Sequence, residues 1–210
     1  MEYYSLIKMA TFPQQLELPT WGGRRPGAGR KRQAARRQVS HQRRPPHAAR
    51  FPLHAVLRTC DDVPRLREKA VFRGIRAALQ AGAARMGFRL VHFSVQGNHL
   101  HLVVEAHDKE TLSRAMQGLA IRIARAVNRA AGRKGRVFAD HYFARELKTP
   151  AEVRRAVRYV LDNRMLHGRL QPQADVCASS APLVQPRTWL LTAGWLRSRA
   201  GPLPVSAWDG

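Results

Sequence analysis

The stretch FRLVHFSVQGNHLHLVVEA, residues 88–106, decides the fold of this chain. Two runs in which apolar and polar residues alternate are joined by Gly97-Asn98. A two-residue connection of this kind predicts a tight β-hairpin, in which Ser94 pairs with His101. Because the side chains of a strand point to alternate faces, the hairpin has one apolar and one polar face. We expect the apolar face to pack on a core and the polar face to remain open.

The segments around the hairpin complete an α+β pattern. The spacing of apolar residues predicts a strand at 51–59, a helix at 64–86, the hairpin, a helix at 108–131, a strand at 136–148 and a helix at 151–167. The order βαββαβ is that of a ferredoxin-like sheet with helices on one face. The last helix follows this unit as an additional C-terminal element.

The composition indicates a polyanionic partner. The 210 residues include 37 Lys and Arg but only 14 Asp and Glu, which gives a formal net charge of +23. A charge this large is typical of proteins that bind nucleic acid, although a ribosome or an anionic membrane surface would also attract it. The two cysteines lie far apart, at Cys60 and Cys177, so no structural zinc site is expected.

The sequence shows no targeting or membrane-spanning segment. The first residues, MEYYSLIKMATFPQQ, lack the basic and apolar regions of a secretory signal. No apolar run approaches the roughly 20 residues that a membrane span needs. We therefore expect a cytoplasmic protein without a membrane partner.

We expect three parts along the chain: a basic arm at 1–47, a folded domain at 48–170 and a tail at 171–210 that contains Pro, Ser and Trp. Glycine, proline and repelling like charges predict that the arm is disordered. Its Arg-Pro-Gly core is similar to an AT-hook, so it is interpreted either as a solvated tail or as an arm that binds DNA. The tail either packs on the domain or contacts a partner.

His99 and His101 are the candidate metal ligands. Two residues apart on a strand, their imidazoles project to the same face and could hold one divalent cation. Tyr159 and Asn163 are four residues apart on the last predicted helix, so they lie on one stripe. Two imidazoles and an amide leave coordination positions for phosphate oxygens and water, which suits Mg²⁺ or Mn²⁺, while Zn²⁺ is a chemical alternative. Two surface histidines and a core-edge tyrosine are the structural alternative.

These residue types could cut a nucleic-acid backbone. A tyrosine phenol with a pKa of about 10 is a weak nucleophile, but a nearby cation favours its ionised form. Attack by Tyr159 on a phosphate would give a covalent phosphotyrosine. Basic side chains would hold the strand through its phosphates. The candidates for this role are Arg24, Arg25, Arg30, Lys31, Arg122, Arg125, Arg129, Arg133, Lys134 and Arg136.

The stretch from about 50 to 170 resembles the HUH-type single-tyrosine transposases, and most closely their REP-associated tyrosine transposase relatives. The resemblance rests on the motifs His99-Leu100-His101 and Tyr159-Val160-Leu161-Asp162-Asn163 and on the order of NHLHLVVEA, IRIARAVNR, GRVFADHYFARELKTP and YVLDN. It implies a nuclease that nicks single-stranded DNA, often beside a hairpin, leaves a 5′-phosphotyrosine and a free 3′-hydroxyl, and rejoins the ends in reverse. It assigns the metal to His99, His101 and Asn163, and the attack to Tyr159.

One position departs from the family pattern. Relatives tend to carry a histidine where this chain has Phe143, beside His141 and Tyr142. This keeps open an inactive, domesticated protein that only binds DNA hairpins. An RNA-binding ferredoxin-like module is a further alternative, but such modules stack bases on exposed strand aromatics, and Phe93 falls on the apolar face. Both a monomer and a homodimer are compatible with the sequence.

Overall fold

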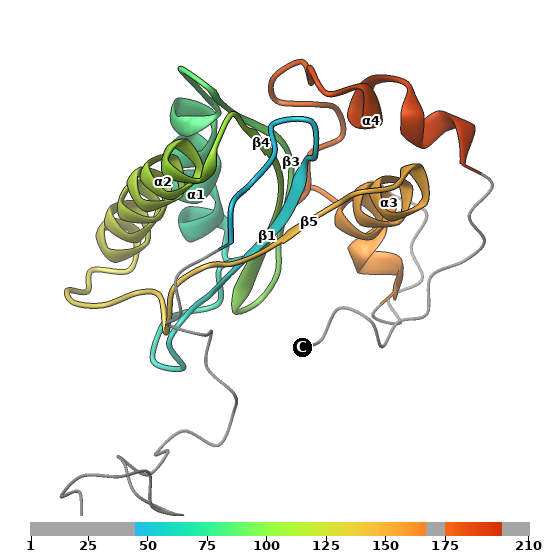
Figure 1. Ribbon diagram of the computed structural model, residues 1–210. Helices are drawn as coiled ribbons and strands as arrows, with labels where there is room; N and C mark the ends of the chain where they lie inside the picture. The colour runs from blue at the N-terminus through green and yellow to red at the C-terminus, as the bar shows by residue number, and fades with distance from the viewer. Residues whose placement is uncertain (1–44, 167–174, 199–210) are drawn as a thin grey trace, which may run out of the picture. The chain divides into compact units, whose positions relative to one another are not determined.

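A computed structural model describes residues 45–166 and 175–198 (Figure 1). Its centre is an antiparallel sheet with the strand order β2-β3-β4-β1-β5. The strands are β1 (Leu53–Arg58), β2 (Ala84–Arg85), β3 (Phe88–Val95), β4 (His99–Ala106) and β5 (Phe143–Glu146). The helices are α1 (Lys69–Gly82), α2 (Lys109–Ala130), α3 (Pro150–Leu166), α4 (Trp189–Thr192) and the 3₁₀ helix η1 (Gly194–Arg197). The predicted ferredoxin-like α+β fold is confirmed.

The sheet is covered on both faces. Helices α1 and α2 lie against one face, while α3 and α4 lie on the other (Figure 1). The expectation that the polar face remains open is therefore wrong. The cause is an apolar stripe on α3, which packs with Val91 of β3 and Val103 of β4 in a second hydrophobic cluster. Burying such a stripe is favourable at roughly 25 cal/mol per Å² of apolar surface.

The main core lies between the sheet and helices α1 and α2. Alternate residues of the strands point into it, among them Leu57, Leu100 and Leu102, which are at most 2% exposed. The alternation that puts Phe93 on this face also predicts Val91 there, but Val91 belongs to the second cluster. The pairing of β3 with β4 shifts register between Leu90 and His92, which is the mark of a β-bulge. An extra residue of this kind interrupts the alternation of side chains, so the sequence pattern no longer predicts which face a residue occupies.

Helix α1 is shorter than the predicted helix at 64–86 at both ends. It ends at Gly82, and the next residues form the short strand β2, which pairs with the start of β3. Gly87 has a φ of 76°, a conformation that glycine adopts without strain, and it forms the turn between these strands. Helical spacing of the apolar residues over 64–86 predicts Met86 on the buried face, but Met86 is 98% exposed in this turn.

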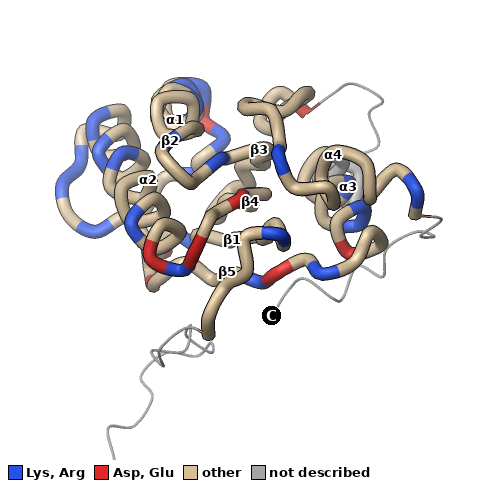
Figure 2. Tube along the Cα trace, turned by 45° about the horizontal axis from the view of Figure 1, so that its top comes forward, with Lys and Arg blue, Asp and Glu red and all other residues tan. Residues whose placement is uncertain are grey.

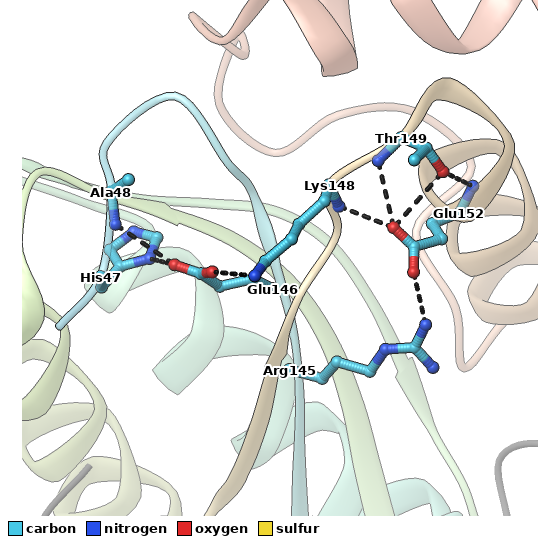
Figure 3. Close-up of polar contacts among 7 residues, drawn as sticks. All are labelled: His47, Ala48, Arg145, Glu146, Lys148, Thr149 and Glu152. Carbon is cyan, nitrogen blue, oxygen red and sulfur yellow. Dashed lines mark hydrogen bonds and ion pairs between the residues drawn. The ribbon is translucent and has the colours of Figure 1, made fainter. Parts of the chain in front are cut away.

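A capping box fixes the start of α3 (Figure 3). The Glu152 amide donates to the Thr149 hydroxyl, and the Thr149 amide donates back to the Glu152 carboxylate. The same carboxylate forms an ion pair with Arg145 of β5 at 2.6 Å. Three residues separate β5 from α3, so this network fixes where the helix leaves the sheet. Every later residue of α3 is placed by this start.

Residues 175–198 pack on the folded unit. The segment 177–183 runs along β3, where the amide of Val95 donates to Cys177 and the amide of Leu183 donates to Val91. Glu105 is 4% exposed and accepts hydrogen bonds from the amides of Arg187 and Thr188. The sequence predicts that the tail either packs on the domain or contacts a partner, and its described residues pack on the domain.

Most of the predicted arm at 1–47, namely residues 1–44, lies outside the described residues. Its last residue, His47, is already part of the packed structure. The His47 Nδ1 atom lies 2.7 Å from the Glu146 carboxylate of β5, and the amide of Ala48 donates to the same oxygen (Figure 3). The chain is thus attached to the sheet from His47 onward.

Candidate active site

The β3–β4 hairpin presents two imidazoles on the face that α3 covers. Ser94 pairs with His101, and the amide of Gln96 donates to the carbonyl of His99, as the hairpin predicts. The ring centroids of His99 and His101 are 4.7 Å apart, with the planes nearly perpendicular. His101 is only 2% exposed, whereas His99 is partly exposed. The pair therefore spans from the protein interior to its surface.

Helix α3 brings Tyr159 to this pair. Its ring centroid lies 4.9 Å from that of His101 in an edge-on arrangement, and the side chain is 3% exposed. The helix packs on β3 and β4, so its buried stripe points at the hairpin. Two predicted site residues from β4 and one from α3 thus meet within a single chain. Asn163 follows one turn later on α3, and its side chain lies outside the described part of the structure.

His54 is a third histidine at this place, and sequence reasoning missed it. It lies on β1, is 1% exposed, and its Nε2 atom is 3.1 Å from Nδ1 of His101. The two rings are stacked, with centroids 5.2 Å apart and an interplanar angle of 10°. Burial, and then the positive charge of Arg145, lower the pKa of His54 to about 4, so its ring is neutral at neutral pH.

His54 carried a weak signal in the sequence. It occupies a polar position between Leu53 and Ala55 in a strand that otherwise reads as apolar. A lone strand histidine has no periodic partner of its own. Only the register of β1 with β4, which pairs His54 with Val103, brings it next to His101.

The donor set fits a small divalent cation. The Nδ1 atom of each hairpin imidazole faces a neighbour, which is Asn98 for His99 and His54 for His101. The Nε2 atoms are therefore the nitrogens that would bind a metal. No group of three or more His, Cys, Asp or Glu side chains suited to a metal occurs in the described part of the chain. Two imidazoles completed by oxygen ligands are consistent with Mg²⁺ or Mn²⁺.

The segment that departs from the family pattern lies on β5. Phe143 is 46% exposed and pairs with Val56, so it shares the sheet face of the imidazoles. Tyr142 packs against the core on the opposite face, and His141 is exposed. Tyr142 thus faces away from the hairpin imidazoles, whereas Tyr159 lies against His101.

The predicted basic residues fall into three groups. Arg122, Arg125 and Arg129 lie on α2, on the far side of the sheet from α3 (Figure 2). Lys134 and its neighbours lie in the loop between α2 and β5. The structure describes the first two groups. The third group lies outside the described residues and consists of Arg24, Arg25, Arg30 and Lys31.

The basic loop after α2 lies at the end of the sheet where His99 is partly exposed. Thr59 pairs with Phe138 of this loop, and its amide donates to the carbonyl of Asn98, next to His99. Two of the basic side chains predicted to contact phosphates already form contacts within the protein. Arg133 forms an ion pair with Asp62 at 2.6 Å, and Arg136 donates to the carbonyls of Phe138 and Ala139.

Arg58 is a second residue that sequence reasoning missed. It pairs directly with His99 across β1 and β4, it is exposed, and it follows the alternation of His54 and Val56. Its guanidinium therefore rises from the same sheet face as the imidazoles. Directly opposed residues in an antiparallel pair have Cβ atoms about 5 Å apart. A phosphate held near His99 would lie within reach of Arg58.

Three comparisons with known proteins bear on this site. The family model described as "Transposase IS200 like" matches residues 48–163, which is more than half of the chain. The chain therefore belongs to the IS200-like transposase family. No curated protein matches it.

Solved structures give more distant matches. One is a REP-associated tyrosine transposase bound to a REP hairpin, with 14% identity and a TM-score of 0.47, over 65% of this chain and 82% of that one. Another is a candidate transposase from Deinococcus radiodurans R1, with 16% identity and a TM-score of 0.36, over 46% of this chain and 78% of that one. Among the described residues, no helix is long and apolar enough to span a membrane. The cytoplasmic location stays a prediction.

Proposed function

We propose that this chain is a metal-dependent transposase-like enzyme that nicks and rejoins single-stranded DNA through a 5′-phosphotyrosine. The observation that carries the proposal is the meeting of His99, His101 and Tyr159. The hairpin imidazoles and the helix phenol come from segments about 60 residues apart in the sequence. The ring centroid of His101 nevertheless lies 4.7 Å from that of His99 and 4.9 Å from that of Tyr159. Membership of the IS200-like transposase family supports the same reaction.

The residues have distinct parts in this proposal. His99 and His101, with Asn163, would hold a Mg²⁺ or Mn²⁺ ion, and such an ion would polarise the scissile phosphate and offset its developing charge. Tyr159 loses its phenolic proton and attacks the phosphorus atom. The bond from phosphorus to the 3′-oxygen breaks, and that oxygen leaves as a hydroxyl after gaining a proton. Rejoining reverses these steps, because a 3′-hydroxyl attacks the phosphotyrosine and releases the phenol.

The DNA partner is proposed to be a single strand that carries a hairpin or palindromic repeat. The basic residues of α2 and of the following loop contact its phosphates, together with the arm at 1–47. Arg58 adds a contact beside His99. The folded domain at 48–170 carries the reaction, and the tail at 171–210 supports it. Because Tyr159 reaches His101 within one chain, a monomer provides the site without exchange of α3 in a homodimer.

The covalent intermediate provides the test. Wild-type protein is incubated with Mg²⁺ or Mn²⁺ and an end-labelled hairpin oligonucleotide, and the products are separated on a denaturing gel. We expect label to migrate with the protein. The Tyr159→Phe variant should give no such band, because it lacks the attacking oxygen, while it retains the ring that packs against His101.

Tyr142→Phe is the matched control and should retain the covalent band. A band that survives in Tyr159→Phe but is lost in Tyr142→Phe would show that Tyr142, and not Tyr159, is the nucleophile. Absence of a band in the wild type, combined with tight hairpin binding, would instead support the inactive hairpin-binding protein. Phe143 at the position of the family histidine is the feature that favours this alternative.

A further inference from the structure

We infer that His54 is a positioning residue, which accepts a hydrogen bond from Nδ1 of His101 and thereby presents Nε2 of His101 to the cation. This inference deepens the proposed function and rests on it for the presence of a cation. His54 lies on β1 and belongs to neither of the two sequence motifs. The contact joins Nε2 of His54 and Nδ1 of His101 at 3.1 Å.

Two imidazole nitrogens in contact must divide their roles, because one has to donate a proton and the other has to accept it. If His54 donates, Nδ1 of His101 uses its lone pair for this bond, and the proton of that neutral ring sits on Nε2. A protonated Nε2 cannot bind a metal ion. If His101 donates, its Nε2 atom carries the lone pair that coordination needs. Only the second arrangement is compatible with a metal ligand.

The partner imidazole follows the same rule. Nδ1 of His99 lies 2.8 Å from the side-chain oxygen of Asn98. An amide oxygen only accepts, so Nδ1 of His99 is the donor and Nε2 carries the lone pair. Both hairpin histidines then adopt the same tautomer, with both Nε2 atoms as ligands. Metal-binding histidines usually donate their other ring N–H to a neighbour in this way.

The surroundings favour a fixed arrangement. His54 and His101 are 1% and 2% exposed, and their planes are 10° from parallel, so both rings are confined by packing. His54 comes from β1, the central neighbour of β4, and its backbone is held by pairing on both sides. His99, by contrast, is oriented by an exposed asparagine. His101 is thus supported by a buried partner, and His99 by an exposed amide at the surface turn.

The tautomer itself can be measured without metal or DNA. Long-range ¹H–¹⁵N correlation spectra of the full-length wild-type protein distinguish protonated from unprotonated ring nitrogens. We expect His101 to be protonated at Nδ1 and His54 to be unprotonated at Nε2. A spectrum in which His101 carries its proton on Nε2 overturns the inference, whatever the variants show.

Two substitutions of His54 separate the hydrogen bond from the space that the ring fills. His54→Leu removes the acceptor but keeps an apolar volume, and it should weaken Mn²⁺ binding roughly 10- to 100-fold. His54→Gln offers an amide oxygen at a similar reach and should restore most of that affinity. His92→Leu is the control, because it removes another buried histidine from the same sheet face, whose ring contacts the Ser179 hydroxyl. It should leave Mn²⁺ affinity unchanged.

The readouts also distinguish this inference from the proposed function. His99→Ala and His101→Ala should abolish Mn²⁺ binding if the hairpin imidazoles hold a cation. If neither change affects Mn²⁺ binding, the proposed function fails. If both abolish it while His54→Leu binds Mn²⁺ like the wild type, only the role of His54 fails. If His54→Leu does not fold, the wild-type spectrum and His54→Gln still decide.

Discussion

The two faces of the sheet are built from the same strands but differ in what they bury. Toward α1 and α2, β4 presents Leu100, Leu102 and Val104, each fully buried in a continuous apolar core. Toward α3, the same strand presents His101 and Glu105, which are also almost fully buried. Burial of polar groups is costly unless they are hydrogen-bonded. The first face therefore supplies apolar packing, whereas the second buries polar groups that need hydrogen-bond partners.

The buried polar groups of the α3 face are matched with partners from distant segments. His101 contacts His54 of β1, His92 contacts the hydroxyl of Ser179, and Glu105 accepts from Thr188. Two of these three partners lie in the segment after residue 175. That segment therefore contributes to the polar face as well as to the edge of the sheet. Substitutions on the two faces should separate stability from function.

The sharpest contrast is between Leu100 and its neighbour His101. Leu100→Ala creates a cavity in the main core and should lower the free energy of unfolding by about 2–5 kcal/mol. His101→Ala should cost less stability but abolish Mn²⁺ binding. Urea unfolding and Mn²⁺ titration of both variants measure the two effects. If His101→Ala destabilised the protein as much as Leu100→Ala and left Mn²⁺ binding intact, the division between the faces would be wrong.

The next effect concerns pH and the α3 face. Burial lowers the pKa of His92 from 6.5 to about 4. Well above pH 6.5 the ring is neutral in both the folded and unfolded chains. As the pH falls toward 4, the unfolded chain takes up a proton that the folded chain does not, so stability decreases, by up to about 3 kcal/mol.

A substitution isolates this contribution. In His92→Gln the free energy of unfolding should fall less steeply between pH 6.5 and pH 4, because the group no longer titrates. His54 shifts in the same direction and is unchanged in the variant, so it contributes equally to both curves. Urea unfolding at a series of pH values gives the slopes. Identical slopes for the variant and the wild type would show that His92 is not responsible.

The smallest expected effect compares arginines on opposite sides of the sheet. Arg58→Ala should weaken binding of unpaired single-stranded DNA and reduce its salt-dependence slope by about 0.7, the value for one phosphate contact. Arg125→Ala on α2 should leave this slope unchanged and affect only a hairpin with a duplex stem. Fluorescence anisotropy at several salt concentrations measures both. A reversed pattern would place the single strand on the α2 side.

Local periodicity explains what the sequence could predict. The alternation around Gly97-Asn98 predicted the hairpin, its register and the shared face of His99 and His101. The four-residue spacing on the last helix predicted that Tyr159 and Asn163 share a stripe. Both rules depend only on neighbours within one element. The structure confirms that Tyr159 and His101 meet, while the roles of these residues stay predictions.

The remaining features depend on contacts between distant segments. His54 and Arg58 became site neighbours only through the register of β1 with β4. The β-bulge between Leu90 and His92 breaks the alternation of β3, so the alternation of apolar and polar residues could not predict the face of Val91. The cover on the polar face was not decided by the local sequence pattern, because packing of α3 and of residues 175–198 there depends on contacts between distant segments. In each case long-range packing, rather than local preference, decided the outcome.

The strand-like run of residues 177–183 beside β3 has a practical consequence. The family match ends at residue 163, which invites removal of everything beyond α3. Such a shortened protein would expose the backbone donors and acceptors of β3 that now pair with Cys177, Ser179 and Leu183. Unprotected strand edges pair with other chains, so the truncated protein should aggregate. Residues up to 198 therefore belong in any version made for crystallisation or enzymology.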